Sequence, residues 1–444
     1  MRQKTTPLMN NKSASEWNSL PGPEDISRWE LENGIVILTR SNFNSPSVVV
    51  SGYLNNGSIF DPDHQLGLAN FACLSLLRGT EQFTFQKIYE SLESVGSSMG
   101  FSASVHNTSF GGRALVEDLP RMLNVLVQAL RYPTFPIEQI EKLRTQLLTG
   151  LAIRNQATSE VASLAYDKAV FNNHPYGRPE DGQPDTIQSI SRQDIEDYHR
   201  AYYGPQGMVI TIVGAVPAKE AFELVHAQLG DWENLEQVSP PEFPQLDRLK
   251  NVHREHIPIP GKVQTDLVMG VLGPHRNSED FLPLSLGNNI FGQFGMMGRI
   301  GDIVRERAGL AYYASTSLSA WINAGSWEVS AGVNPENLQR AINLILQELN
   351  RFTEETVTVE ELQDSQANYI GRLPLALESN FGVASALMNI ERFQLGLDYY
   401  QRYPELVKEI TAQQVLEVSR RYMDTSSLCI ISAGPDEINS NDLS

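Results

Sequence analysis

Residues 67–80, GLANFACLSLLRGT, form the stretch of this 444-residue chain that says most about its fold. Asn70, Cys73 and Leu74 stand at positions i, i+3 and i+4, which share one face of a helix. A zinc site on such a face takes His, Cys or carboxylate ligands in a tetrahedral arrangement. Leu has no lone pair, and a lone Asn beside a lone Cys cannot complete the tetrahedron. The stretch therefore predicts a helix whose side chains cannot hold a metal ion.

The length and composition indicate a folded protein of two or more domains. A chain of 444 residues exceeds the size that one hydrophobic core usually serves. Its content of 41% hydrophobic and 8% aromatic residues is typical of a globular protein and excludes general disorder. A net charge of −19 argues against nucleic acid or an anionic membrane as a partner, since neither attracts an acidic surface.

The cysteines and the N-terminal residues indicate the cellular compartment in which the protein is expected. Cys73 and Cys429 lie in apolar surroundings far apart in the sequence, which predicts two buried thiols in a reducing compartment rather than a disulfide. The first 25 residues contain no apolar run of signal-peptide length. No later segment is long and apolar enough to span a bilayer. We therefore expect a cytoplasmic chain with a short N-terminal tail.

The sequence contains two related halves. Residues 135–151, FPIEQIEKLRTQLLTGL, are similar to residues 357–373, VTVEELQDSQANYIGRL. Residues 190–215 are similar to residues 410–434, at an offset of 220 positions. Two segment pairs with nearly equal offsets indicate a duplicated unit of a little over 200 residues, which is too long for a solenoid repeat.

Each half alternates strand and helix patterns. Runs of β-branched residues bounded by Gly and Asn predict paired strands, and Leu or Ile stripes at helical spacing predict helices over 119–130 and 338–352. These patterns predict an α+β fold of two homologous domains, each a mostly antiparallel sheet with helices packed on one side. The predicted segments are an N-terminal tail (1–27), a first domain (28–232), a linker rich in Pro and charge (233–250), a second domain (251–436) and a C-terminal tail (437–444).

Four segments carry a resemblance to a known family. They are GLANFACLSLLRGT (67–80), VHNTSFGGRALVEDLPRMLNVLVQALRYPTF (105–135), HPYGRPEDG (174–182) and FGMMGRIGDIVRERAGLAYYAS (294–315). Together they resemble the mitochondrial-processing-peptidase-like, or M16, metallopeptidases of the pitrilysin superfamily, in particular the bacterial two-subunit branch. The resemblance runs from about residue 28 to residue 436. It implies two LuxS/MPP-like metallohydrolase domains in one chain and a clamshell of two chains around a peptide chamber.

The resemblance also implies where the zinc ligands of the family would fall. In the family's His-x-x-Glu-His motif, the two His positions correspond to Asn70 and Leu74, and the general-base Glu corresponds to Cys73. The third ligand, a Glu in a later helix, corresponds to Thr149 or Gly150. None of these residues fits its role, so we expect no metal and no catalytic residue in this chain. Zinc is expected in a partner subunit instead.

A second motif has kept the residues that the family uses. In the two-subunit branch, the subunit without zinc supplies an Arg and a Tyr, which correspond here to Arg305 and Tyr312. The segment GRIGDIVRERA predicts a helix that ends at Gly309, followed by a strand in LAYYASTSLS. A guanidinium and a phenol would then bind a peptide carbonyl that gains negative charge during attack. The alternative is an Arg that only favours a helix C-terminus and a Tyr that only packs.

The function that follows is a non-catalytic subunit of a heterodimeric zinc endopeptidase, inactive alone, with unfolded peptides as substrates. Two alternatives remain open. The chain could be a structural or scaffolding homologue without a part in proteolysis, or a homodimeric peptidase that would need a metal of its own.

Other candidate sites are weaker. His253 and His256 are predicted to lie on a strand, where side chains three apart point to opposite faces and do not share a metal. Cys73 has no neighbouring His or cation in the sequence to activate it. The Gly-rich segment 292–298 lacks the Lys-Ser/Thr end of a phosphate loop, and we expect at most a substrate-facing loop there.

Overall fold

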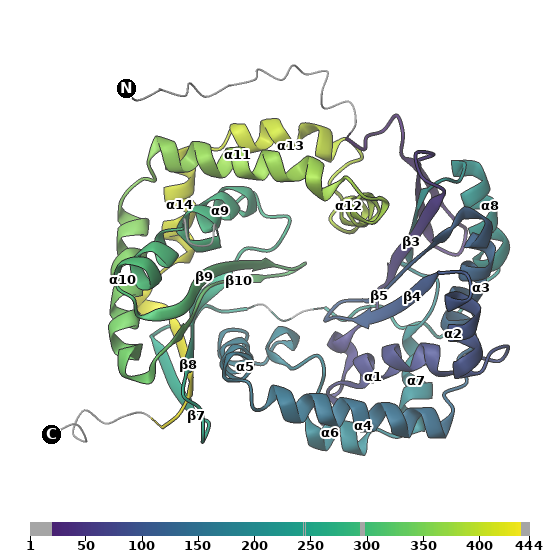
Figure 1. Cartoon of the computed structure of the whole chain (residues 1–444), viewed down its shortest axis with the longest axis horizontal. Coiled ribbons are helices and arrows are strands. Elements are labelled where there is room, and N and C mark those ends of the chain that lie inside the picture. Colours follow the sequence, from purple (N-terminus) through teal and green to yellow (C-terminus); the bar gives the residue numbers. More distant parts are fainter. Residues whose placement is uncertain (1–19, 243, 245, 294–297, 437–444) are drawn as a thin grey trace, which may run out of the picture.

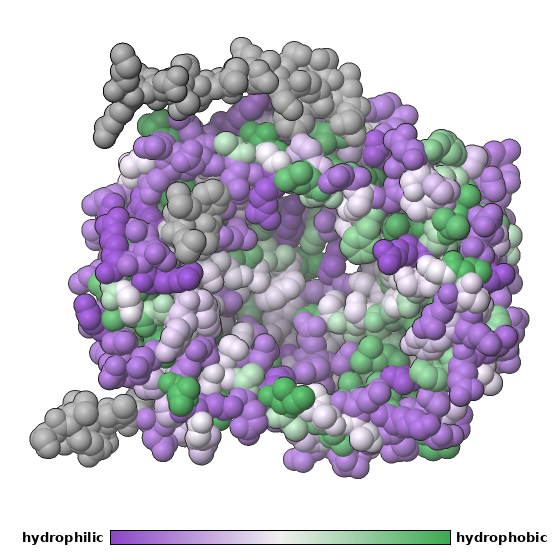
Figure 2. Space-filling model, in the orientation of Figure 1, coloured by the Kyte–Doolittle hydropathy of each residue, from purple (hydrophilic) through white to green (hydrophobic). Residues whose placement is uncertain are grey.

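The computed structural model describes residues 20–242, 244, 246–293 and 298–436. Most of the two predicted tails and residues 294–297 of the Gly-rich segment lie outside the described residues. The chain forms two halves, each a sheet with helices on its outer side (Figure 1). The space-filling view is hollowed between the two halves (Figure 2).

The first half contains a six-stranded sheet in the order β1-β2-β6-β3-β5-β4. Strands β2 and β6 run parallel, and every other neighbouring pair is antiparallel. Strand β4 lies at one edge of the sheet, where its outer hydrogen-bonding side has no strand partner among the described residues. The strands are β1 (Ser27–Glu30), β2 (Val36–Ser41), β3 (Ser47–Leu54), β4 (Ser98–Ala103), β5 (Thr108–Leu115) and β6 (Val209–Gly214).

The second half contains a five-stranded sheet in the order β7-β11-β8-β10-β9. Here β7 and β11 run parallel, and the remaining pairs are antiparallel. The strands are β7 (His253–Pro258), β8 (Thr265–Gly273), β9 (Ala311–Ala320), β10 (Gly325–Val333) and β11 (Cys429–Gly434).

The two sheets repeat one topology, which confirms the predicted pair of homologous α+β units. From the parallel pair outward, β2-β6-β3-β5-β4 and β7-β11-β8-β10-β9 match strand for strand in order and direction. The first residues of β6 and β11, Val209 and Cys429, are 220 positions apart, as the sequence offset predicts. Only β1 has no counterpart among the described strands of the second sheet.

Helices cover the outer face of each sheet, because each presents an apolar stripe. The predicted stripes are confirmed: Leu119, Leu123, Leu126 and Leu130 are buried in the first half, and residues 338, 342, 345, 349 and 352 in the second. The helices of the first half are α1 (Leu68–Ser75), α2 (Phe85–Glu93), α3 (Leu119–Arg131), α4 (Ile137–Arg154), α5 (Thr158–Val170), α6 (Pro184–Ser189), α7 (Arg192–Tyr202) and α8 (Ala218–Leu229). Those of the second half are α9 (Phe281–Asn288), α10 (Leu338–Glu354), α11 (Val359–Ala376), α12 (Asn380–Arg392), α13 (Tyr399–Lys408) and α14 (Ala412–Tyr422).

The halves exchange one helix each. Helix α5 of the first half packs on β8 and β11 of the second sheet, where Tyr166 is fully buried among Val268, Ile431 and their neighbours. Helix α12 of the second half packs on β3 and β6 of the first sheet, where Leu387 is fully buried against Val49 and other strand residues. The sequence predicted helices on one side of each sheet only. The exchange explains why β6 and β11 are buried on both faces.

Between α8 and β7 the described residues form neither helix nor strand. The domain bounds stay a prediction. In the part of the chain that the structure describes, no helix combines the length and apolar character needed to cross a bilayer.

Candidate functional site

Helix α1, on which the resemblance places Asn70, Cys73 and Leu74 at the metal-site positions, begins at a buried carboxylate that the sequence did not single out. Both oxygens of Asp61 accept hydrogen bonds of 2.9 Å, from the amides of Gly67 and Ala69. Gly67 adopts a left-handed conformation with φ of 90°, which suits glycine. Burial raises the pKa of Asp61 to about 7, although the two hydrogen bonds from the backbone amides act to lower it. The first turn of α1 is therefore fixed by Asp61, which satisfies amides that a helix end leaves free.

The side chains of α1 do not fit a zinc ion. Asn70 and Leu74 are half-buried on one side of the helix, while Cys73 is 1% exposed and packs inward. On α4, the hydroxyl of Thr149 donates to the carbonyl of Thr145 in its own helix, and Gly150 has no side chain to offer. A tetrahedral zinc site needs at least three protein ligands, and these residues of α1 and α4 do not provide them. Among the described residues, no three His, Cys, Asp or Glu side chains lie together in a group that could hold a metal ion.

The surroundings of the two thiols disfavour a nucleophilic role. Neither Cys73 nor Cys429 forms a disulfide, and both are buried, as the sequence predicted. Burial raises the pKa of each thiol to about 12, so the thiolate is scarce at neutral pH.

Arg305 lies on a short π-helical segment, η9 (Gly301–Arg307), that packs on β9. The predicted stop is confirmed, because Gly309 has φ of 63° and its amide donates to the carbonyl of Arg305 at 3.1 Å. The side chain of Arg305 is 43% exposed, and its only described ion pair is a 3.7 Å contact with the adjacent Glu306. Its guanidinium is therefore open to a ligand.

Tyr312 stands at a β-bulge. In the pairing of β9 with β10, Gly332 lies opposite Tyr313 and Val333 opposite Ala311, so Tyr312 is the extra residue. The side chain of Tyr312 is 65% exposed, and its hydroxyl has no hydrogen-bond partner among the described residues. Tyr313 differs, since its hydroxyl donates to Asp266 at 2.6 Å. The structure thus holds Arg305 and Tyr312 on consecutive, packed elements without a hydrogen bond between them.

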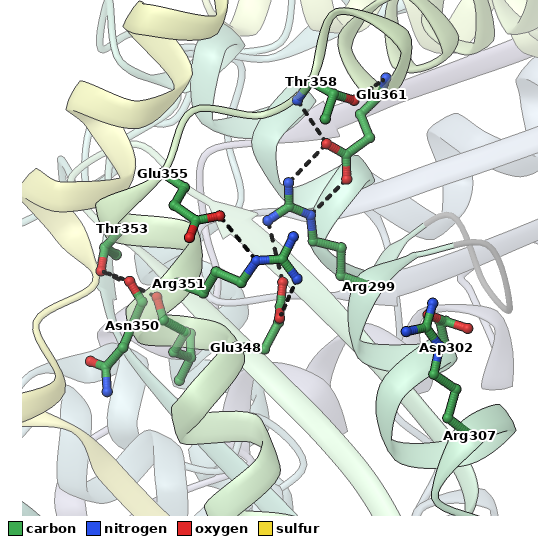
Figure 3. A network of polar contacts seen from close by, with 11 residues as sticks. Arg299, Asp302, Arg307, Glu348, Asn350, Arg351, Thr353, Glu355, Thr358 and Glu361 are labelled. Carbon is green, nitrogen blue, oxygen red and sulfur yellow. Dashed lines mark hydrogen bonds and ion pairs between the residues drawn. The ribbon is translucent and has the colours of Figure 1, made fainter.

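A buried ionic network fixes the start of the segment that carries Arg305 (Figure 3). Arg299 donates two hydrogen bonds, of 2.7 and 2.8 Å, to Glu361 of α11, and a third of 3.3 Å to Glu348 of α10. The side chains of Arg299 and Glu348 are only 10% and 4% exposed. A second cation, Arg351, forms an ion pair with Glu348, with its Nη1 atom 3.4 Å from Oε2. This network joins the residue two positions before η9 to α10 and α11, and no spacing in the sequence signals it.

Three of the histidines make contacts that indicate structural roles. His253 and His256 lie on β7, as predicted, and His256 hydrogen-bonds to the hydroxyl of Ser432 and the carbonyl of Pro435. The Nε2 atom of His253 lies 3.6 Å from a carboxylate oxygen of Glu255 instead. His174 accepts a hydrogen bond from the amide of Tyr176 and shapes the loop that follows α5.

Comparison with known families matches both halves of the chain. A model described as "Insulinase (Peptidase family M16)" matches residues 36–181, and one described as "Peptidase M16 inactive domain" matches residues 189–369. Among curated relatives, the uncharacterized zinc protease YmxG of Bacillus subtilis is 24% identical over 394 residues, covering 89% of this chain and 94% of that protein. An uncharacterized zinc protease of Rickettsia bellii is 23% identical over 431 residues, covering 94% and 99%.

Solved structures share the fold. A peptidase M16 inactive domain from Pseudomonas fluorescens superposes with a TM-score of 0.86 at 23% identity, over 93% of this chain and 98% of that one. A protease from Helicobacter pylori gives the same TM-score at 18% identity, over 94% of this chain and all of the other. Identities this low establish the fold alone. Together with the two family models, which span most of the chain, they show that this protein belongs to peptidase family M16.

Proposed function

We propose that this chain is the non-catalytic subunit of an M16-type zinc endopeptidase and presents Arg305 and Tyr312 to peptides held by a zinc-bearing partner. The observation that carries the proposal is a contrast between two motifs. The zinc positions hold Asn70, Cys73 and Leu74, which cannot bind the metal. The Arg–Tyr motif, in contrast, retains two polar side chains that are exposed and lack strong partners.

The chemistry of the pair suits a peptide carbonyl. A guanidinium is always charged and offers several N–H donors in a fixed plane, and a phenol offers one O–H donor. Both groups stabilise an oxygen on which negative charge develops as a nucleophile attacks the carbonyl carbon. An interaction that strengthens between ground state and transition state raises kcat rather than only lowering KM. In this proposal, Arg305 and Tyr312 act on the substrate, and the partner's zinc supplies the activated water.

The exposure of the pair supports this role over a structural one. A Tyr that stabilises a strand is usually packed, and an Arg that stabilises a helix end usually bonds to its last carbonyls. Tyr312 is instead 65% exposed at a bulge, and the carbonyl of Arg305 is already satisfied by Gly309. Bulges re-aim side chains and are common beside active sites.

The substrates proposed are unfolded peptides or short protein segments. The hollow between the two halves is a recess of the kind that a second, similar chain would close into a chamber (Figure 2). Such a chamber excludes folded domains by size.

The test is a reconstitution with the zinc-bearing M16 protein of the same host. We expect Arg305→Ala and Tyr312→Phe each to lower kcat for a fluorogenic peptide by about 10- to 100-fold, with a smaller change in KM. Arg340→Ala is the matched control, because Arg340 is an exposed arginine on α10. Unchanged turnover with both variants would exclude the proposed role and favour a scaffolding protein.

A metal analysis tests the remaining alternative. Purified chain that contains one equivalent of zinc and cleaves peptides alone would be a homodimeric peptidase, contrary to this proposal.

A further inference from the structure

The second half contains a pocket that the Arg–Tyr motif does not use. It has a volume of about 380 Å³ and lies among α9, α11, α13 and β9. Its lining includes Arg276, Arg372, Tyr369, Tyr399 and Tyr403, together with several apolar side chains and no Asp or Glu. The whole chain has a net charge of −19, whereas the lining of this pocket contains two arginines and no carboxylate. Such a lining favours an anionic ligand.

The internal repeat allows the position of this pocket to be compared with the corresponding position in the first half. Helix α9 lies between β8 and β9, as α1 lies between β3 and β4, so the two helices correspond. Helices α4 and α11 correspond as well, since residues 357–373 repeat residues 135–151, and this alignment places Arg372 at the counterpart of Gly150. The pocket therefore lies in the second half where the first half has the emptied zinc positions. Arg372 places a fixed positive charge opposite Gly150, which is one of the two candidate counterparts of the third zinc ligand.

The two guanidinium groups are available to an anion. Within the described residues, no carboxylate oxygen lies within 4.0 Å of either group. Two acids adjacent in sequence to lining residues are paired with other arginines, Asp398 with Arg402 at 2.7 Å and Asp280 with Arg421 at 2.6 Å.

Aromatic rings hold Arg276 in place. The guanidinium carbon of Arg276 lies 4.2 Å from the ring centre of Phe281 and 5.3 Å from that of Phe393. Its Nη2 atom donates to the hydroxyl of Tyr399 at 3.4 Å. A cation already packed against aromatic rings loses little further freedom when a ligand binds, which favours binding.

The tyrosine hydroxyls that line the pocket add neutral hydrogen-bond donors. Burial raises the pKa of Tyr369 to about 12 and also raises the pKa of Tyr403, so both hydroxyls keep their protons at neutral pH. The hydroxyl of Tyr369 donates to the carbonyl of Ser285 at 3.0 Å. The hydroxyl of Tyr403 has no hydrogen-bond partner among the described residues and remains free to donate to an anion.

The apolar part of the lining narrows the ligand class. Leu282, Leu318 and Leu373 contribute to the wall, and the volume is at the small end of the range of about 300–1,000 Å³ that ligand pockets span. A free inorganic anion has no group to cover these side chains. A carboxylate attached to one apolar side chain matches both the charged and the apolar parts.

We propose that this pocket binds the C-terminal carboxylate of a peptide whose last residue is apolar. The identification of the ligand as a peptide rests on the proposed function, whereas the carboxylate chemistry rests on the pocket alone. Arg372 and Arg276 bind the carboxylate, Tyr403 donates a further hydrogen bond, and the leucine wall covers the last side chain. The pocket anchors one end of a substrate and takes no part in the chemical step.

The experiment measures binding to the isolated full-length chain, without a partner and without turnover. The probe is a fluorescein-labelled pentapeptide of four alanines and a C-terminal phenylalanine, followed by fluorescence anisotropy. We expect the free-acid peptide to bind about tenfold or more tightly than the same peptide with a C-terminal amide, since the amide lacks the charge. Replacing the phenylalanine by serine should weaken binding because the apolar contact is lost.

Variants identify the pocket as the binding site. Arg372→Gln should weaken the free-acid peptide about tenfold and remove most of the preference over the amide. Tyr403→Phe should weaken it by a smaller factor. Arg340→Gln removes the same charge from an exposed arginine on α10 and should change nothing. Because Arg372 is exposed, its replacement leaves the fold intact.

Three outcomes would overturn the proposal. They are equal binding of acid and amide peptides, equal effects of Arg372→Gln and Arg340→Gln, and binding of free N-acetylphenylalanine without binding of the peptide. The last outcome would assign the pocket to a small aromatic acid. A failure of the Arg305 and Tyr312 variants to affect turnover would leave this binding result unchanged, so the two proposals fail separately.

Discussion

The guanidinium of Arg299 and the carboxylate of Glu361 face each other in a two-point contact, with Nε to Oε1 at 2.7 Å and Nη2 to Oε2 at 2.8 Å (Figure 3). The contact joins Arg299, two residues before η9, to the first turn of α11. Glu361 also accepts the amide of Thr358 at 2.8 Å, so one carboxylate both caps a helix and holds a buried cation. The position of η9, and hence of Arg305, depends on this pair.

Replacing Glu361 by Gln tests the pair. We expect a loss of about 1–2 kcal/mol in the free energy of unfolding, at the lower end for charged hydrogen bonds because Glu361 is partly open to water. Burial acts to raise the pKa of Glu361. The Arg299 guanidinium and the hydrogen bonds at Thr358 outweigh this effect and lower the pKa to about 2. The wild type therefore keeps this stabilisation above pH 4.5 and loses it as pH falls toward 2. Denaturant titrations at several pH values should show the Gln variant without this loss.

Exposed Glu360 provides the control for that substitution. It is adjacent in α11 and forms no described ion pair, so Glu360→Gln should leave both the stability and its acid dependence unchanged. Equal behaviour of the two variants would contradict the role assigned to the Arg299 contact.

Glu328 of β10 gives a pH dependence of opposite sign. Burial raises the pKa of this carboxyl from 4.5 to about 7 in the folded chain. The folded state therefore holds a proton that the unfolded state has released between those values, so stability falls as pH rises from 4.5 to 7. Glu328→Gln should raise the free energy of unfolding by up to about 3 kcal/mol at pH 8 and by little at pH 4. Urea unfolding at both pH values measures the difference, and a gain at pH 4 equal to that at pH 8 would refute it.

The exchanged helix α12 should make the stability of the two halves inseparable. Leu387→Ala removes a fully buried side chain between α12 and the first sheet and should cost about 2–5 kcal/mol. Hydrogen exchange read by mass spectrometry should show faster exchange in β3 and also in β8. Leu375→Ala, at a position 71% exposed, should affect neither strand. Faster exchange in β3 alone would mean that each half is stable by itself.

The buried thiols should be unreactive in the native state. Burial raises the pKa of Cys73 and Cys429 to about 12, and no disulfide joins them. A thiol reagent at pH 8 should therefore label neither cysteine of the folded chain and both of the unfolded chain. Rapid labelling of Cys73 before unfolding would reopen the question of a nucleophile in α1.

Local patterns in the sequence predicted much of the fold. The stripe from Leu119 to Leu130 and the 220-residue offset between β6 and β11 need only periodicity and self-similarity, and both are confirmed. The exchange of α5 and α12 escaped prediction because a helical stripe shows that a face is buried but not against which sheet. The same limit applies to strand β6, whose residues are all buried.

The site was less predictable than the fold. The helix end at Gly309 followed from a local rule, whereas the bulge at Tyr312 depends on the register with β10. Asp61 at the start of α1 and the partners of Arg299 come from residues distant in the sequence, and no spacing signals them. The pocket around Arg372 joins four separate elements, so only the folded chain brings its charges together.

The reciprocal exchange of α5 and α12 has a mechanical consequence for this protein. A hinge between the halves would have to pull two helices off two sheets at once and would expose apolar faces on both sides. The two halves are therefore expected to move together as one rigid unit. Under the proposed function, a peptide would therefore be admitted by motion of the whole chain relative to its partner subunit, and not by bending between the two halves.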